Sequence, residues 1–355
     1  MDKYTKAIVD TILDNNTEIK LKRLNFENLL IKASQNRVLY IFCKKIIKKY
    51  KLSNVQIRII NNIIKKGEKN ILATRHTIHL LQKILKKNNI DFLVVKTFKY
   101  LDYVTFDLDI LVHYKNFQKT IDILQMNKIL VKKHPNPSTQ GIHQRNCFYP
   151  DCIKIDLHRK FFWLGINHID ENFAWQNTQI KKLYGTKCKV PSLETDFLLH
   201  NKQLVYERRY ITLLDFLAIK YAIDEGLNWK KILQQINKYK WKKTFFYLLN
   251  YLNFINSKIY NKEMLDINKL SSYNIKPIPK NKILKLPLTF PMLEVINIFK
   301  EIYYDHKKID YFGFAYYFFS TFRYKLTNKI PYYDHWYGFN KLYNKKYTRS
   351  EVIYK

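Results

Sequence analysis

The stretch FDLDILV, residues 106–112, limits the possible folds more than any other part of the chain. Carboxylates are rarely buried without a partner, yet Asp107 and Asp109 lie one residue apart inside an apolar run. On a β-strand, residues i and i+2 point to the same side, so both carboxylates project together while Leu108 and Ile110 pack behind them. The sequence therefore predicts a strand with one apolar face and one acidic face.

Two carboxylates at this spacing repel each other unless a cation neutralises them, and a divalent metal is the usual solution. Mg²⁺ is bound by a few carboxylates and keeps positions for water and phosphate oxygens. A third carboxylate on a neighbouring strand would complete a site for in-line attack on phosphorus. Asp156 is the natural candidate, because it lies on the polar side of the alternating run CIKIDLH, residues 152–158. Lys154 and His158 share that side with Asp156.

Hydrophobic periodicity changes several times along the chain. Residues 1–70 have helical spacing, and a second strong helix is expected over 72–88. Strands are expected at 91–95, 106–112, 128–133 and 152–158, with a helix over 114–125 and a polar loop after residue 133. After Pro191 the pattern is helical to about residue 258, and residues 261–290 are basic, contain proline and are typical of a linker or an extended arm.

The net charge of +34, from 63 basic and 29 acidic residues, indicates a polyanionic partner, most often a nucleic acid. Lys far exceeds Arg, and Ile, Asn and Tyr are abundant, as in proteins from AT-rich genomes. Part of the charge can therefore reflect genome composition. The alternative interpretation is a solvated lysine surface without a nucleic-acid partner.

The order of these motifs resembles that of the DNA polymerase β-like nucleotidyltransferase superfamily. More narrowly, it resembles a bacterial and archaeal nucleotidyltransferase family of unknown substrate. That family has an apolar strand ending in Leu-Lys-Gly, then D-I-D-L-L-V, then E/D-L-H. The corresponding segments here are LVVKT (93–97), DLDILV (107–112) and IDLHR (155–159), and the resemblance covers about residues 20–260.

This resemblance implies an α+β fold, in which a polymerase β-type core of a small mixed sheet and flanking helices lies inside N- and C-terminal helical regions. We expect four regions along the chain. They are an N-terminal helical region (1–70), the nucleotidyltransferase core (71–190), a helical domain (191–260) and a basic, aromatic-rich C-terminal appendage (261–355).

The resemblance also implies an enzyme that transfers a nucleoside monophosphate from a nucleoside triphosphate (NTP) to a hydroxyl, with Mg²⁺ or Mn²⁺ as cofactor. Asp107, Asp109 and Asp156 match the metal-binding carboxylates, and Asp156 would also activate the acceptor hydroxyl. Lys96, Thr97 and His158 match positions that bind the nucleotide, and His158 can instead orient Asp156. The basic charge favours RNA, such as tRNA, as the acceptor, with a protein or a small molecule as alternatives.

One position departs from the family pattern. The superfamily has Gly, often Gly-Ser, at the turn after the first strand, where small residues let backbone amides approach a triphosphate. Here the turn reads Lys96-Thr97-Phe98, and no glycine occurs between residues 68 and 140. The alternative function is therefore a catalytically inactive protein that keeps the nucleotidyltransferase fold and binds nucleic acid.

Other sequence features indicate the cell compartment of the protein. The four cysteines lack paired spacing, which is typical of cytosolic proteins whose thiols are reduced. The sequence shows no signal-peptide pattern and no uncharged apolar run of about 18 residues. We expect a cytoplasmic protein without a transmembrane segment. His200 and Asp215 suit a structural hydrogen bond, whereas the cluster 207–209 suits either a solvated surface or a substrate phosphate contact.

Overall fold

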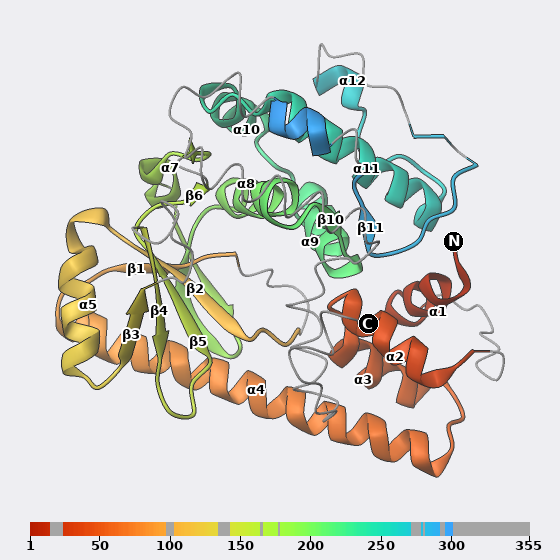
Figure 1. Ribbon diagram of the computed structural model, residues 1–355, viewed down its shortest axis with the longest axis horizontal. Helices are drawn as coiled ribbons and strands as arrows, with labels where there is room; N and C mark the ends of the chain where they lie inside the picture. Colours follow the sequence, from red (N-terminus) through yellow and green to blue (C-terminus); the bar gives the residue numbers. More distant parts are fainter. Residues whose placement is uncertain are drawn as a thin grey trace.

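A five-stranded sheet lies at one end of the molecule, helices lie at the other, and one long helix runs beneath both (Figure 1). This computed structural model describes residues 1–14, 24–96, 103–133, 143–163, 166–176, 178–270, 278–279, 281–291 and 295–300. Among the described helices, none has both the length and the hydropathy needed to cross a bilayer.

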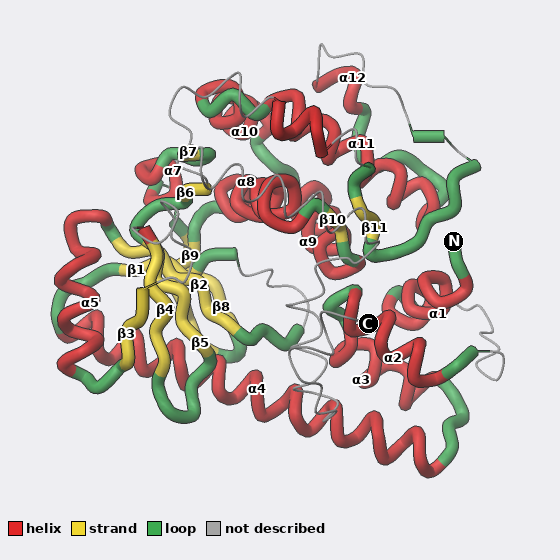
Figure 2. The backbone as a smooth tube through the Cα atoms, viewed as in Figure 1, coloured by secondary structure: helices red, strands yellow, loops and turns green. Residues whose placement is uncertain are grey.

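The main sheet is mixed, as the resemblance implied, and Figure 2 shows its strands side by side. The strand order is β1 (Phe92–Val94), β2 (Asp107–Val112), β5 (Lys154–His158), β4 (Gln144–Phe148) and β3 (Leu130–Lys133). Strands β2 and β5 are parallel, and the other three pairs are antiparallel. The parallel pair at the centre carries both acidic motifs.

Helices account for most of the other elements. Before the sheet come α1 (Lys3–Ile12), α2 (Phe26–Gln35), α3 (Leu39–Lys49) and α4 (Asn54–Lys87). Within the core are η2 (Tyr114–Asn116), α5 (Phe117–Met126), β6 (Phe162–Trp163), β7 (Ile166–Asn167), α7 (Glu171–Trp175) and the hairpin β8 (Gln179–Leu183) and β9 (Thr186–Val190). The remainder are α8 (Leu193–Lys202), η3 (Gln203–Arg208), β10 (Tyr210–Ile211), α9 (Leu213–Asp224), α10 (Trp229–Lys238), α11 (Lys242–Tyr260), α12 (Ile267–Leu270) and β11 (Leu288–Thr289).

The two faces of the sheet pack against different partners. Leu108 and Ile110 of β2 belong to a buried cluster with the second half of α4 and with α5. Leu93 of β1 and Leu111 of β2, on the opposite face, belong to a second cluster formed mostly by the helices before and after the core. The acidic face of β2 is therefore turned toward the helical part of the chain, where α8 and α9 lie (Figure 1).

Helix α4 runs unbroken for 34 residues, so the expected division into two helices near residue 70 is wrong. A capping box at Ser53 starts the helix. Gly67, in its middle, is a weak helix former, but the ring of Tyr40 fills the space where a Cβ atom would lie. The packing of α3 against this glycine compensates for its low helix propensity.

Strand β4 lies where the sequence analysis expected only a polar loop after residue 133. Its sequence, QRNCF, buries only the side chain of Cys147, so the hydrophobic signal of a strand is almost absent. Backbone pairing with β3 and β5 on both sides stabilises the strand instead. Such pairing depends on residues far away in the chain, so the sequence of β4 itself shows no hydrophobic pattern that would predict a strand.

The segment 281–290 is not a simple linker. Leu284, Leu286 and Phe290 are buried, and the amide of Asp2 donates a hydrogen bond of 3.0 Å to the carbonyl of Leu284. Strand β11 in this segment pairs with β10. The segment therefore packs on both the N-terminal helices and the helical region after the core. Residues 301–355, the last part of the expected appendage, lie outside the described residues.

Candidate active site

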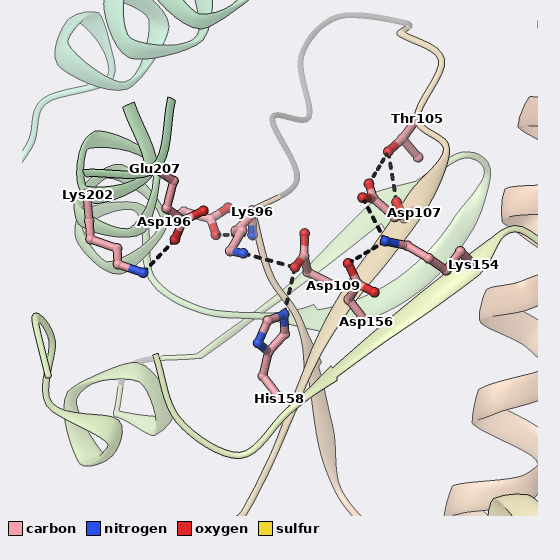
Figure 3. Close-up of polar contacts among 10 residues, drawn as sticks. All are labelled: Lys96, Thr105, Asp107, Asp109, Lys154, Asp156, His158, Asp196, Lys202 and Glu207. Carbon is pink, nitrogen blue, oxygen red and sulfur yellow. Dashed lines mark hydrogen bonds and ion pairs between the residues drawn. The ribbon is translucent and has the colours of Figure 1, made fainter. Parts of the chain in front are cut away.

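The register between β2 and β5 builds a row of charged side chains. Asp107 lies opposite Lys154, and Asp109 lies opposite Asp156. Because residues paired across two strands share a face, these four side chains and His158 project from the same side of the sheet (Figure 3). The structure thus brings together the three aspartates that the sequence analysis selected.

Lys96 enters this row from the end of β1. Its ammonium donates a hydrogen bond of 3.0 Å to Oδ1 of Asp109, and its amide donates one of 3.1 Å to Oδ1 of Asp196 in α8. The φ angle of Lys96 is 56°, in the left-handed region that residues with a Cβ atom rarely adopt. Such conformations gather at functional sites, where surrounding contacts stabilise them. Thr97 lies outside the described residues.

Asp109 is held by two partners on one oxygen. Nε2 of His158 lies 2.7 Å from Oδ1, on which Lys96 also donates. Burial alone would raise the pKa of Asp109, but Lys96 and His158 together hold that pKa well below its usual range. Burial and the charge of Lys96 lower the pKa of His158, so its imidazole is neutral and donates from Nε2. His158 therefore contacts Asp109. The sequence analysis had expected it to bind the nucleotide or to orient Asp156.

Asp156 has the opposite electrostatic environment. Burial, together with the charges of Asp109 and Asp107, raises the pKa of Asp156 to about 7, although Lys154 lies 3.0 Å from Oδ2 and lowers it. Among the described residues, Oδ1 of Asp156 is buried and has no hydrogen-bond partner. A buried acceptor without a donor is costly in a folded protein. A hydrogen-bond donor or a cation at this oxygen would therefore be stabilising.

Asp107 is the most exposed of the three carboxylates. Thr105 contacts it from the segment before β2, with Oγ1 3.4 Å from Oδ1 of Asp107 and 2.8 Å from its backbone carbonyl. Its Oδ2 lies 3.7 Å from the ammonium of Lys154. Side-chain exposure thus decreases from Asp107 through Asp109 to Asp156.

A second pair of buried charges reaches the row from the helical region. Lys202 at the end of α8 lies 2.7 Å from Glu207 in η3, a π-helical turn. Burial opposes the ionisation of Glu207, but the charges of Lys202 and Lys96 hold its pKa at about 2. Glu207 and Asp109 in turn keep Lys96 charged despite its burial. Figure 3 shows the pair beside Lys96.

The sequence analysis assigned no role to Lys154 or Lys202 and considered Glu207 only as part of the cluster 207–209. The alternation of β5 placed Lys154 on the polar face with Asp156, and this was the sequence signal that could have indicated its place in the site. The cluster 207–209 was expected to be solvated, to cap a helix or to contact a substrate phosphate. In the structure, Glu207 pairs with the buried Lys202, and Arg208 pairs with the buried Asp215. No local pattern distinguishes an inward from an outward charge in this helix.

His200 and Asp215 have a structural role, as expected. Oδ1 of Asp215 lies 3.1 Å from Arg208, 3.2 Å from Nε2 of His200 and 3.6 Å from Arg37. Oδ2 of Asp215 accepts two hydrogen bonds from Thr212, which caps α9. This cluster joins the turn after α2 to α8, η3 and α9.

Within the described residues, no three His, Cys, Asp or Glu side chains are grouped as ligands around one metal. The ammonium of Lys154 contacts two of the three carboxylates, those of Asp107 and Asp156. The residues nevertheless suit a hard divalent cation. Their donors are carboxylate oxygens, and the buried Oδ1 of Asp156 lacks a partner among the described residues.

Comparisons with known proteins relate the chain to one family. A family model described as "Uncharacterised nucleotidyltransferase" matches residues 22–254. A search of curated protein sequences finds no significant match. Among solved structures, the chain is similar to the lincosamide antibiotic adenylyltransferase LnuA with lincomycin bound. The identity is 14%, the match covers 42% of this chain and 97% of that chain, and the TM-score is 0.31. The chain belongs to the uncharacterised nucleotidyltransferase family.

Proposed function

We propose that the protein is a metal-dependent nucleotidyltransferase that moves a nucleoside monophosphate from an NTP to a hydroxyl of RNA. The observation that carries this proposal is the register of β2 and β5, which sets Asp109 beside Asp156 with an unpaired oxygen on the latter among the described residues. Family membership supports nucleotide transfer in general. The metal, the acceptor and the residue roles belong to the proposal.

Asp107, Asp109 and Asp156 would hold Mg²⁺ or Mn²⁺. When bound, the metal would supply positive charge for the phosphate oxygens and for the acceptor oxygen. The protein's own part begins with orientation. His158 and Lys96 fix Oδ1 of Asp109 from two sides. A carboxylate held in this way loses little freedom when it becomes a ligand.

Asp156 would act as the general base. The reaction forms a bond between the acceptor oxygen and the α-phosphorus and breaks the bond from that phosphorus to pyrophosphate. The acceptor hydroxyl must lose its proton, and the carboxylate of Asp156 would accept it. In the metal-free protein the pKa of this group is raised to about 7, close to neutral pH. Burial of this carboxylate excludes water that would compete for the proton.

Lys96 would contact the triphosphate. Its side chain is buried at the edge of the carboxylate row, and its ammonium stays charged. An ammonium acts on phosphate oxygens as a point charge. The charge of Glu207, which also pairs with Lys202, favours the charged form of Lys96. Thr97, the other expected phosphate contact, lies outside the described residues.

RNA is the acceptor that the charge of the protein favours. The net charge is +34, and long-range attraction to polyanions follows from it. Helix α4 contains one acidic residue, Glu68. Its exposed lysine and arginine side chains are those of Arg58, Lys65, Lys69, Arg75, Lys83, Lys86 and Lys87. These positions extend along the helix that underlies the whole molecule (Figure 1).

The test is incubation of the full chain with each α-³²P-labelled NTP, Mg²⁺ and total RNA. Asp107→Asn and Asp109→Asn are run in parallel. Asp122→Asn serves as a matched control, because Asp122 is exposed on α5, away from the acidic face. The proposal expects label on RNA with the wild type and with Asp122→Asn, and none with the other two variants.

Label on protein or on a small molecule would contradict RNA as the acceptor while leaving the carboxylates in their roles. Equal labelling by all four proteins would contradict the assignment of the catalytic carboxylates. An absence of labelling, together with RNA binding that weakens steeply with salt in every variant, would indicate the binding-only alternative.

A further inference from the structure

Lys154 has an unusual position for a lysine. The β2–β5 register places it directly opposite Asp107 and two residues before Asp156, on the acidic face. Its ammonium lies 3.0 Å from Oδ2 of Asp156 and 3.7 Å from Oδ2 of Asp107. The group thus stands between two carboxylates that the proposed function assigns to a metal.

A metal and an ammonium cannot share this position. Mg²⁺ takes carboxylate oxygens at about 2.1 Å, so a metal held by Asp107 and Asp156 would draw together oxygens that the ammonium now separates. Two cations at this separation also repel each other strongly in a partly buried site. Within the described residues, the carboxylates are in fact not grouped as ligands around one point.

Lys154 also has a route out of the site. Its side chain is 34% exposed, whereas that of Lys96 is 12% exposed. The four-carbon stem of lysine lets its head group swing into water without any change of the backbone. Lys96 remains in place because Asp109, Glu207 and the amide contact to Asp196 hold it.

We infer that Lys154 is an internal cation that occupies a metal position between Asp107 and Asp156, so that a divalent metal binds only by displacing its ammonium. This inference rests on the proposed metal site. Lys154 is then a positioning residue that keeps the carboxylates neutralised in the absence of metal and sets the affinity of the site for the metal.

The experiment is a titration of the nucleotide-free full chain with Mn²⁺, in which free Mn²⁺ is measured by electron paramagnetic resonance. Four proteins are compared: wild type, Lys154→Met, Lys154→Arg and Lys132→Met. Lys132 is exposed on β3, on the same face of the sheet and two strands from Asp156, or about 10 Å. It controls for the loss of one charge without the loss of a competing cation.

We expect Lys154→Met to bind Mn²⁺ about tenfold more tightly than the wild type, since a competing charge has left. Lys154→Arg should bind more weakly, because a guanidinium grips carboxylates with two donors. Lys132→Met should stay within about twofold of the wild type. Equal affinity of Lys154→Met and Lys132→Met would overturn the inference, as would unchanged affinity of Lys154→Arg.

Thermal unfolding supplies a second measurement if Lys154→Met folds poorly. In EDTA this variant should melt below the wild type, and Mn²⁺ should raise its Tm by more than it raises that of the wild type. An equal rise would count against the inference. Asp107→Asn separates the two proposals. If this variant binds Mn²⁺ as tightly as the wild type, the proposed metal site itself is wrong.

Discussion

Nε2 of His158 lies 2.7 Å from Oδ1 of Asp109, and the ammonium of Lys96 reaches the same oxygen from the end of β1. One carboxylate oxygen therefore accepts from two donors that come from different strands. Because both donors are largely buried, Asp109 has little freedom to rotate. Under the proposed function, Asp109 is a metal ligand whose orientation is already fixed, and His158 is a positioning residue.

Replacing His158 with alanine should lower kcat for nucleotide transfer by about 10–100-fold, which is the usual effect of removing a group that orients a metal ligand. The KM for NTP should change less, because Lys96 remains. His76→Ala is the control, since His76 is exposed on α4. Steady-state kinetics of both variants check this prediction, and a kcat for His158→Ala within twofold of the wild type would contradict it.

Replacing Asp156 with asparagine should abolish transfer and yet stabilise the metal-free protein at alkaline pH. The folded-state pKa of Asp156 is raised from 3.8 to about 7. Between these pH values the folded state holds a proton that the unfolded state has lost, so stability falls as pH rises through this window. The loss is at most about 4 kcal/mol. Asparagine has no charge to bury, so the variant avoids this loss of stability.

Thermal unfolding in EDTA at pH 5 and pH 8 checks the prediction for Asp156. The wild type should lose more stability between these two values than Asp156→Asn does. Parallel changes in Tm for the two proteins would show that the raised pKa is absent. Added Mn²⁺ should reduce the difference at pH 8, because it neutralises the same carboxylates in the wild type.

Asp215→Asn should destabilise the protein by about 3–5 kcal/mol, because it leaves Arg208 and Arg37 near a buried site without their counter-charge. Asp224→Asn is the matched control. Its carboxylate pairs with Lys220 at the exposed surface and should contribute within about 0.5 kcal/mol. Urea unfolding of the two variants measures the difference.

The same cluster predicts sensitivity to acid. Burial opposes the charge of Asp215, but Arg208, His200 and Arg37 hold its pKa well below the usual range. Its stabilising contribution is therefore complete above the unfolded-state pKa of 3.8 and is lost as pH falls below that value. The acid limb of the stability profile should be shallower in Asp215→Asn than in the wild type.

Gly67→Ala should destabilise the protein by about 1–3 kcal/mol, although alanine is the better helix former. The added Cβ atom would overlap the buried ring of Tyr40, which has to move. Asn61→Ala, at an exposed position of the same helix, should instead raise stability by a few tenths of a kcal/mol. An increase in the urea midpoint for Gly67→Ala would contradict the packing argument.

The strands and helices with a strong local period were predictable. Period-two alternation in β5 and the apolar run of β2 located Asp107, Asp109 and Asp156 on one face before their pairing was known. Strand β4 and the continuity of α4 were not predictable. The first depends on backbone partners on both sides, and the second depends on a ring that fills the space beside Gly67.

The sequence by itself determined which side chains can share a face, because the direction of a side chain alternates along a strand whatever lies beside it. It could not determine what each side chain meets. The parallel register of β2 and β5 decided that Lys154 stands between Asp107 and Asp156. The packing of the helical region on the sheet brought Glu207 to Lys96. Such contacts join residues far apart in the chain, so only tertiary structure decides them, and they set the charge of the site.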